Sequence, residues 1–266
     1  MESTAATAAS EPAQTQQYFA IAPTVRAAGS EDGIVLLDLA AGTYHSLNPV
    51  GSRVWQHLAR GRSRSEVLGR LTDLFDAPSA KIEADVHALL SQLARLGMLV
   101  PSQERPAAAA AIAPPVAAMH PAAYPRSGPS RPSDAPAPSF GADAWWLARS
   151  LLAFAYMDVL TRLRRFPGVR RAVIAAQPLA PRPRSPLLWR IVAAVERAAS
   201  FYYKRRWCLQ RSAACAYLLR RSGFAVQWVL GAQILPFIAH AWVELDGEVV
   251  NDDPKLTAGF TVLDRI

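Results

Sequence analysis

Cysteine is scarce in this 266-residue sequence, which contains only Cys208 and Cys215. The two residues lie seven positions apart in a stretch that reads as one helix, where seven residues rise about 10 Å. A disulfide requires Cα atoms within about 7 Å of each other, so we expect no bond between these cysteines. Both should remain thiols, as a reducing compartment permits.

The sequence also lacks targeting and membrane signals. The first 16 residues contain neither a basic region nor an apolar stretch of the kind that marks a secretory signal. No run approaches the ~18 apolar residues that span a bilayer. The most apolar stretch, at residues 150–157, is followed at once by Asp158. We therefore expect a cytoplasmic protein without a membrane span.

The phosphate-binding P-loop is missing as well, so ATP chemistry in this chain is unsupported, and we predict no metal and no cofactor. The net charge of +8 is uneven, since residues 1–100 carry 8 basic and 10 acidic side chains and residues 141–266 carry 18 and 9. The basic half could attract nucleic acid. Without a nucleic-acid motif, solvated helix faces rich in arginine are the better interpretation.

A proline-rich segment divides the chain. Residues 101–140 hold 10 of the 21 prolines, and proline removes backbone donors and fixes φ. We interpret this segment as an extended linker between domains at residues 17–100 and 141–266. His120 lies in the linker and is therefore a poor catalytic candidate.

The two domains have different patterns. Residues 17–100 predict three strands followed by three helices, with strands at 18–26, 33–39 and 43–47 and helices at about 49–58, 63–75 and 79–96. Ser63 and Glu66 have the spacing of a capping box. Residues 141–266 predict helices at 145–165 and 187–203 and from about Cys208, then strands at 225–230, 238–245 and 248–250. The predicted fold class is α+β throughout.

Three residues of the second domain form a coherent chemical set. Cys208 stands at a predicted helix start, whose dipole stabilises a thiolate. His240 could accept and return the proton, and Asp252 could hold the imidazole in the required tautomer. In isolation, each has a structural explanation: a buried thiol, a strand histidine and a turn aspartate. Cys215, between Ala214 and Ala216, fits the buried thiol better.

Turn geometry supports the pairing of histidine and aspartate. Asp246-Gly247 between apolar runs predicts a tight hairpin, in which facing residue numbers sum to about 493. His240 would then oppose residue 253, which brings Asp252 within reach if the register differs by one. Asp253 is the competitor, since the two aspartates point to opposite faces of a continuous strand.

Several motifs of residues 145–266 resemble the leader peptidase of lasso peptide biosynthesis, one of the transglutaminase-like, papain-related cysteine peptidases. They are WCLQRS from Trp207, LLRRSG from Leu218, AHAWVE from Ala239 and VND from Val250. The resemblance implies Cys208 as nucleophile, His240 as general acid and base, and Asp252 as its orienting group. Gln210 departs from the family at a position outside the triad. The backbone N–H of Cys208 is one expected oxyanion donor, and the second stays open.

The first domain resembles the PqqD-like recognition domains of ribosomal peptide pathways, through GTYHSLN from Gly42, VW from Val54 and LARLGML from Leu93. Such domains are small winged helices that bind a precursor leader as an added strand, in a groove closed by the third helix. The implied edge strand is Thr43, Tyr44, His45, Ser46 and Leu47, and the implied groove residues are Val86, Leu89, Leu90 and Leu93. The groove residues could equally serve only as core.

The two resemblances together imply a leader peptidase that captures a lasso precursor and cuts at the leader–core junction. They also imply a separate partner, an ATP-dependent, asparagine-synthetase-like macrolactam synthetase. One alternative is acyl transfer to an amine, as in true transglutaminases, because the same triad supports it. A DNA-binding winged helix is the other, and the net charge of −2 over residues 1–100 (8 basic, 10 acidic) opposes it.

Overall fold

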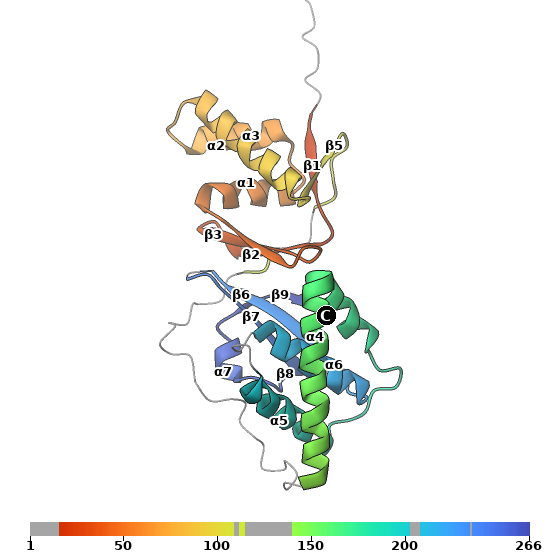
Figure 1. Ribbon diagram of the computed structural model, residues 1–266. Helices are drawn as coiled ribbons and strands as arrows, with labels where there is room; N and C mark the ends of the chain where they lie inside the picture. Colours follow the sequence, from red (N-terminus) through yellow and green to blue (C-terminus); the bar gives the residue numbers. More distant parts are fainter. Residues whose placement is uncertain (1–15, 109–111, 115–139, 203–207, 235) are drawn as a thin grey trace, which may run out of the picture. The chain divides into compact units, whose positions relative to one another are not determined.

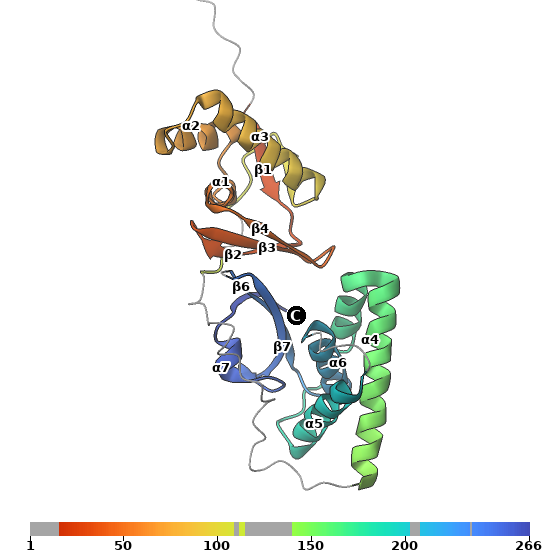
Figure 2. The same cartoon turned by 60° about the vertical axis from the view of Figure 1, so that its left-hand side comes forward.

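The computed structural model describes residues 16–108, 112–114, 140–202, 208–234 and 236–266. The chain divides into two compact units, and Figures 1 and 2 label their helices and strands. The first unit comprises Met1–Ala22 and Arg53–Ala110, and the second comprises Pro23–Ser52 and Ala111–Ile266. The predicted domains at 17–100 and 141–266 thus differ from the compact units, because residues 23–52 group with the C-terminal part.

The first unit consists of a two-stranded sheet and helices. Strand β1 (Tyr18–Ile21) runs antiparallel to β5 (Leu99–Ser102). Helix α2 (Arg64–Leu74) begins with the predicted capping box, in which Ser63 accepts from the Glu66 N–H and Glu66 accepts from the Ser63 N–H. Helix α3 (Ser79–Arg95) ends before Gly97, whose φ of 72° is the left-handed conformation that glycine tolerates. Helix α1 (Pro49–Ala59) crosses the boundary, and its residues from Arg53 onward belong to this unit.

The second unit begins with a three-stranded antiparallel sheet, in the order β2-β3-β4. Its strands are β2 (Val25–Ser30), β3 (Gly33–Asp38) and β4 (Thr43–Leu47). The prediction of one strand over residues 18–26 was wrong, since the chain turns at Pro23-Thr24 and separates β1 from β2. Proline has no N–H to give to a ladder, which explains the break.

Strand β3 is buried on both faces, as its continuous apolar sequence indicates. Val35 and Leu37 belong to the main core cluster of the second unit, together with residues of its helices and of its other sheet. Gly42, with a φ of 72°, lies so near Phe166 that a Cβ would stand 2.2 Å from the Phe166 Cβ. Arg26 of β2 forms an ion pair with Asp264 at 3.0 Å. The β2-β3-β4 sheet is therefore part of the core of the second unit.

The rest of the second unit combines three long helices and the short helix α7 with a four-stranded sheet in the order β8-β7-β6-β9. Helices α4, α5 and α6 pack on one another, and α6 packs on β7 (Figures 1 and 2). The helix bounds are α4 (Phe140–Ala175), α5 (Pro186–Phe201), α6 (Cys208–Arg221) and α7 (Pro254–Thr257). The strand bounds are β6 (Gln227–Gln233), β7 (Ile238–Leu245), β8 (Glu248–Val249) and β9 (Thr261–Arg265).

These elements match the sequence pattern closely, with three differences. The predicted helix ended at Arg165, where the backbone of α4 breaks with φ 52°, but the helix continues past Pro167 to Ala175. Strand β9, which pairs with β6, was not predicted. Within the predicted linker, Ala113 forms a parallel bridge to Ala28 of β2, and residues 109–111 and 115–139 lie outside the described part of the chain.

Candidate active site

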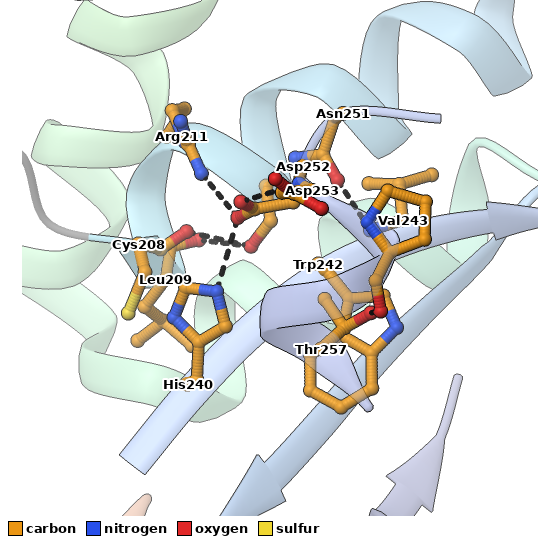
Figure 3. Close-up of polar contacts among 12 residues, drawn as sticks. Cys208, Leu209, Arg211, His240, Trp242, Val243, Asn251, Asp252, Asp253 and Thr257 are labelled. Atoms are coloured by element: carbon orange, nitrogen blue, oxygen red, sulfur yellow. Dashed lines mark hydrogen bonds and ion pairs between the residues drawn. The ribbon is translucent and has the colours of Figure 1, made fainter. Parts of the chain in front are cut away.

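The β7–β8 hairpin brings His240 and Asp252 together. Asp246 and Gly247 have φ values of 53° and 79°, as a type I′ turn requires. Glu244 pairs with Val249, which is the predicted register with a sum of 493. Beyond β8, the Asp252 side chain reaches back, and its Oδ2 lies 3.0 Å from Nε2 of His240 (Figure 3).

The two neighbouring aspartates have separate roles. The Asp253 side chain caps helix α7, where its Oδ1 accepts from the Lys255 N–H at 2.8 Å. Its own N–H donates to Oδ1 of Asp252 at 2.9 Å, which leaves Oδ2 of Asp252 for the imidazole. Asn251 fixes this loop, because its Oδ1 accepts from the Val243 N–H at 2.6 Å. The geometry therefore pairs His240 with Asp252 and gives Asp253 a capping function.

Cys208 is the first residue of α6 and faces His240 across the helix–strand contact. Its Sγ lies 4.0 Å from the Ala239 carbonyl oxygen on β7. The His240 side chain also lowers the pKa of the thiol, as a neighbouring imidazole does. Since Nε2 of His240 contacts Asp252, the ring bridges the thiol and the carboxylate. The three predicted residues thus form one connected chain of contacts.

The pKa shifts of these three residues favour a pair of a Cys208 thiolate and a His240 imidazolium. Burial alone would raise the pKa of Cys208, but the hydrogen bond and charge of His240 outweigh burial and lower it. Burial likewise opposes the charge of His240, yet its contacts with Asp252 and Cys208 raise its pKa to about 9. Burial would raise the pKa of Asp252, and His240 and Arg211 reverse this and lower it. Each charge is therefore held by its neighbour.

Arg211 is a site residue to which the sequence analysis gave no role. From α6 it donates to Oδ2 of Asp252 (Figure 3). It also donates, at 3.2 Å, to Oε2 of Glu196 on α5. Its guanidinium is largely buried, with a side-chain exposure of 17%. The available signal was its place three residues after Cys208, where one helical turn puts it on the same face. Arg211 keeps the Asp252 carboxylate ionised and fixes its position.

Aromatic rings surround the imidazole on its other side. The His240 ring lies 5.0 Å from Phe260 and 6.0 Å from Trp242, centroid to centroid. The indole N–H of Trp242 is satisfied by Oε1 of Glu244 at 2.8 Å. With a side-chain exposure of 13%, the imidazole lies in a mostly buried site, where its contact with Asp252 is stronger than in water.

Other predictions concern residues near the triad. Gln210 is buried, and its amide lies 3.4 Å from Oδ1 of Asp158 on α4, so its role is in helix packing. The second oxyanion donor is not identified, and residues 203–207, next to Cys208, lie outside the described residues.

Among the described residues, no cluster of histidine, cysteine and carboxylate side chains could hold a metal ion. No described helix is long and apolar enough to cross a membrane.

The predicted leader-binding residues occupy two elements. Thr43–Leu47 form β4, an edge strand of its sheet, in which Thr43 and Ser46 are exposed and the other three half-buried. On α3, Val86, Leu90 and Leu93 are at most 3% exposed and belong to the core, whereas Leu89 is half-buried. The groove between the two elements stays a prediction from the resemblance, with Leu89 as its most accessible member on α3.

Comparison with known protein families assigns both parts of the chain. Residues 153–265 match the model of the transglutaminase-like superfamily, and residues 33–99 match that of coenzyme PQQ synthesis protein D, PqqD. The microcin J25-processing protein McjB of Escherichia coli is 34% identical over 59 residues. That alignment covers 22% of this chain and 28% of McjB, so the chain spans about a quarter of this relative.

Two solved structures are also similar in sequence. TbiB1 in complex with the TbiA(beta) leader peptide is 33% identical, covers 30% of this chain and 92% of its own, and has a TM-score of 0.29. A lasso peptide synthetase B1 complexed with the leader peptide is 32% identical, with 31% and 98% covered and a TM-score of 0.30. By the two family models, the chain contains a PqqD domain in its N-terminal part and a transglutaminase-like domain in its C-terminal part, the composition implied by its resemblance to the B proteins of lasso peptide biosynthesis.

Proposed function

We propose that this protein is a cysteine peptidase that hydrolyses the leader–core junction of a lasso precursor peptide. The observation that carries the proposal is the placement of three side chains: Nε2 of His240 lies 3.0 Å from Oδ2 of Asp252, and the Cys208 thiol lies 4.0 Å from the carbonyl of Ala239, the residue before His240. The imidazole also lowers the pKa of the Cys208 thiol. Membership of the transglutaminase-like superfamily and the similarity to the microcin-processing protein McjB support the same chemistry.

The reaction follows from this geometry in two halves. The Cys208 thiolate attacks the carbonyl carbon of the scissile bond, and the developing oxyanion accepts a hydrogen bond from the Cys208 N–H. His240, protonated in the pair, gives its proton to the leaving amine, so that the core departs and the leader remains as a thioester. His240 then takes a proton from water, the hydroxide attacks the thioester, and the leader leaves as a carboxylate while His240 and Cys208 regain their ion pair.

The PqqD part supplies leader capture in this proposal. Strand β4 lies at a sheet edge, where a leader could add as a further strand through backbone hydrogen bonds. Capture on the same chain raises the effective concentration of the junction near Cys208, so weak leader binding suffices. The released core amine would become the substrate of the ATP-dependent macrolactam synthetase that the resemblance implies.

Acyl transfer to an amine is the competing reaction, and the match to the transglutaminase-like superfamily supports it. Both reactions share the thioester and differ only in the group that attacks it. The Cys–His–Asp geometry serves either, so the test must identify that group.

Mass spectrometry of a lasso precursor incubated in H₂¹⁸O decides the reaction. We expect the leader to be released with one ¹⁸O in its new carboxylate and the Cys208→Ser variant to release none. Cys215→Ser is the matched control and should cleave normally, since Cys215 is buried away from substrate. Adding a primary amine distinguishes the alternative, because an amide-linked leader would indicate a transferase. Cleavage retained in Cys208→Ser would sink the peptidase assignment.

A labelled leader peptide titrated into the full-length Cys208→Ser chain tests capture without turnover. Leu89→Asp, at the half-buried position on α3, should weaken binding by about tenfold, because a charge replaces an apolar contact. Leu74→Asp is the matched control on α2, where the side chain is 52% exposed, and should bind as the parent does. Equal affinities in both variants would place the leader elsewhere.

A further inference from the structure

Strand β4 presents one aromatic side chain to the core of the second unit. Tyr44 pairs in register with Leu37 of β3 and packs, half-buried, against the cluster to which Leu37 belongs. Its ring lies 5.8 Å from that of Phe237, at an interplanar angle of 54°. Phe237 directly precedes β7, the strand that carries His240. A residue of the PqqD part therefore stands beside the strand that holds the catalytic histidine.

The same tyrosine is close to the nucleophile. The thiol of Cys208 approaches the carbonyl of Ala239, two residues after Phe237. Burial raises the pKa of Tyr44, and the negative charge of Cys208 raises it further, in line with the ring contact that joins Tyr44 to Phe237 at the start of this strand. Cys208 itself is half-buried, so one side of it stays open to substrate.

We propose that Tyr44 and Phe237 form an aromatic subsite beside Cys208, which holds an apolar substrate side chain near the scissile bond and shields the thiol from water. This inference rests on the proposed peptidase function and adds a substrate-binding role for two side chains outside the triad. Phe237 is 47% exposed, so its ring is available to a ligand. An aromatic wall of this kind gains from burying apolar substrate surface.

In this proposal β4 has two functions: its backbone binds the leader, and its Tyr44 side chain forms part of the subsite. Its backbone edge is available to the leader, because β4 is the outer strand of the order β2-β3-β4. Its Tyr44 side chain points instead into the unit that contains Cys208. Recognition of the leader and of the cleavage position would then share one strand, and a leader that shifts this strand would also adjust the subsite.

Four full-length variants test the subsite: Tyr44→Ala, Tyr44→Phe, Phe237→Ala and, as a control, Tyr156→Ala. Tyr44→Ala and Phe237→Ala should raise KM for the precursor about tenfold, since an aromatic contact is lost. Tyr44→Ala should also speed alkylation of Cys208 by iodoacetamide, a reaction that needs no leader. Tyr44→Phe keeps the ring and should stay near the parent in both measurements. Tyr156 lies on α4, 42% exposed, and its removal should change neither.

Circular dichroism and thermal melting establish that each variant is folded before it is compared. Unchanged KM and unchanged alkylation in Tyr44→Ala and Phe237→Ala would overturn the subsite. An equal loss in Tyr44→Phe and Tyr44→Ala would overturn the assignment to the ring. If the parent cleaves no precursor while Tyr44→Ala still accelerates alkylation, the aromatic shield stands and the peptidase proposal fails instead.

Discussion

The first turn and the middle of helix α6 hold the same residue type in opposite chemical states. At the first turn, Cys208 is half-buried and contacts His240, and these contacts lower its pKa. Two turns later, Cys215 is fully buried among alanines, and burial raises its pKa. The difference shows that the strand and loop facing the helix, rather than the cysteine, decide which thiol has the lower pKa.

Thiol modification gives the largest expected contrast between the two regions. In the native protein, iodoacetamide should modify Cys208 and leave Cys215 intact, with rates that differ by at least about 10³-fold, because Cys215 reacts only after unfolding. Peptide mapping by mass spectrometry measures each site. The Cys208→Ser variant should take up no label until denaturant is added. Native labelling of Cys215 would break the contrast.

The neighbouring carboxylates should differ by the next largest amount. Asp252→Asn removes the charge that orients His240 and should lower kcat/KM by about 10²- to 10⁴-fold. Asp253→Asn is the matched control, since an asparagine still caps a helix, and it should keep nearly full activity. Steady-state cleavage of the precursor by both variants measures the difference. Equal losses would mean that the loop geometry, not the Asp252 charge, is what matters.

The contact between His240 and Asp252 could be predicted because their spacing is local. A two-residue turn fixes the register of β7 and β8, so His240 and a following aspartate had to meet. The choice between Asp252 and Asp253 could not be made from strand alternation. Strand β8 ends at Val249, and the aspartates lie in a loop shaped by the Asn251 side chain and by the cap of α7.

Long-range features were beyond the sequence pattern. The β2-β3-β4 sheet groups with the C-terminal core because of the elements that pack against β3. The apolar sequence of β3 indicates only that both of its faces are buried, and does not indicate by which elements. In the sequence, nothing distinguished Arg211 from the other arginines of the basic C-terminal half. Its role depends on Glu196 and Asp252, which come from α5 and from the loop after β8.

Arg211 lies between the two cysteines on α6 and contacts the Asp252 carboxylate, which pairs with His240. Arg211→Met should lower kcat/KM by about 10- to 100-fold, the range of a lost charged hydrogen bond. Glu196→Gln removes the ion pair on the other side of the guanidinium and serves as control. It should reduce the melting temperature as Arg211→Met does but spare kcat. A parallel loss of kcat in both variants would reduce Arg211 to a structural residue.

The pH dependence carries the smallest expected change. The pKa of His240 is raised to about 9, so cleavage should fall above that pH as the leaving amine loses its proton donor. The acid limb reports the lowered pKa of Cys208, since activity is lost as the thiolate is protonated. Asp252→Asn removes a contact that raises the His240 pKa, so the alkaline limb of kcat/KM should move about one unit lower. Alkylation by iodoacetamide is the internal control: it needs only the thiolate, should keep the acid limb and should show no decline near pH 9. An alkaline limb that stays in place in Asp252→Asn would mean that Cys208 alone holds the imidazole proton.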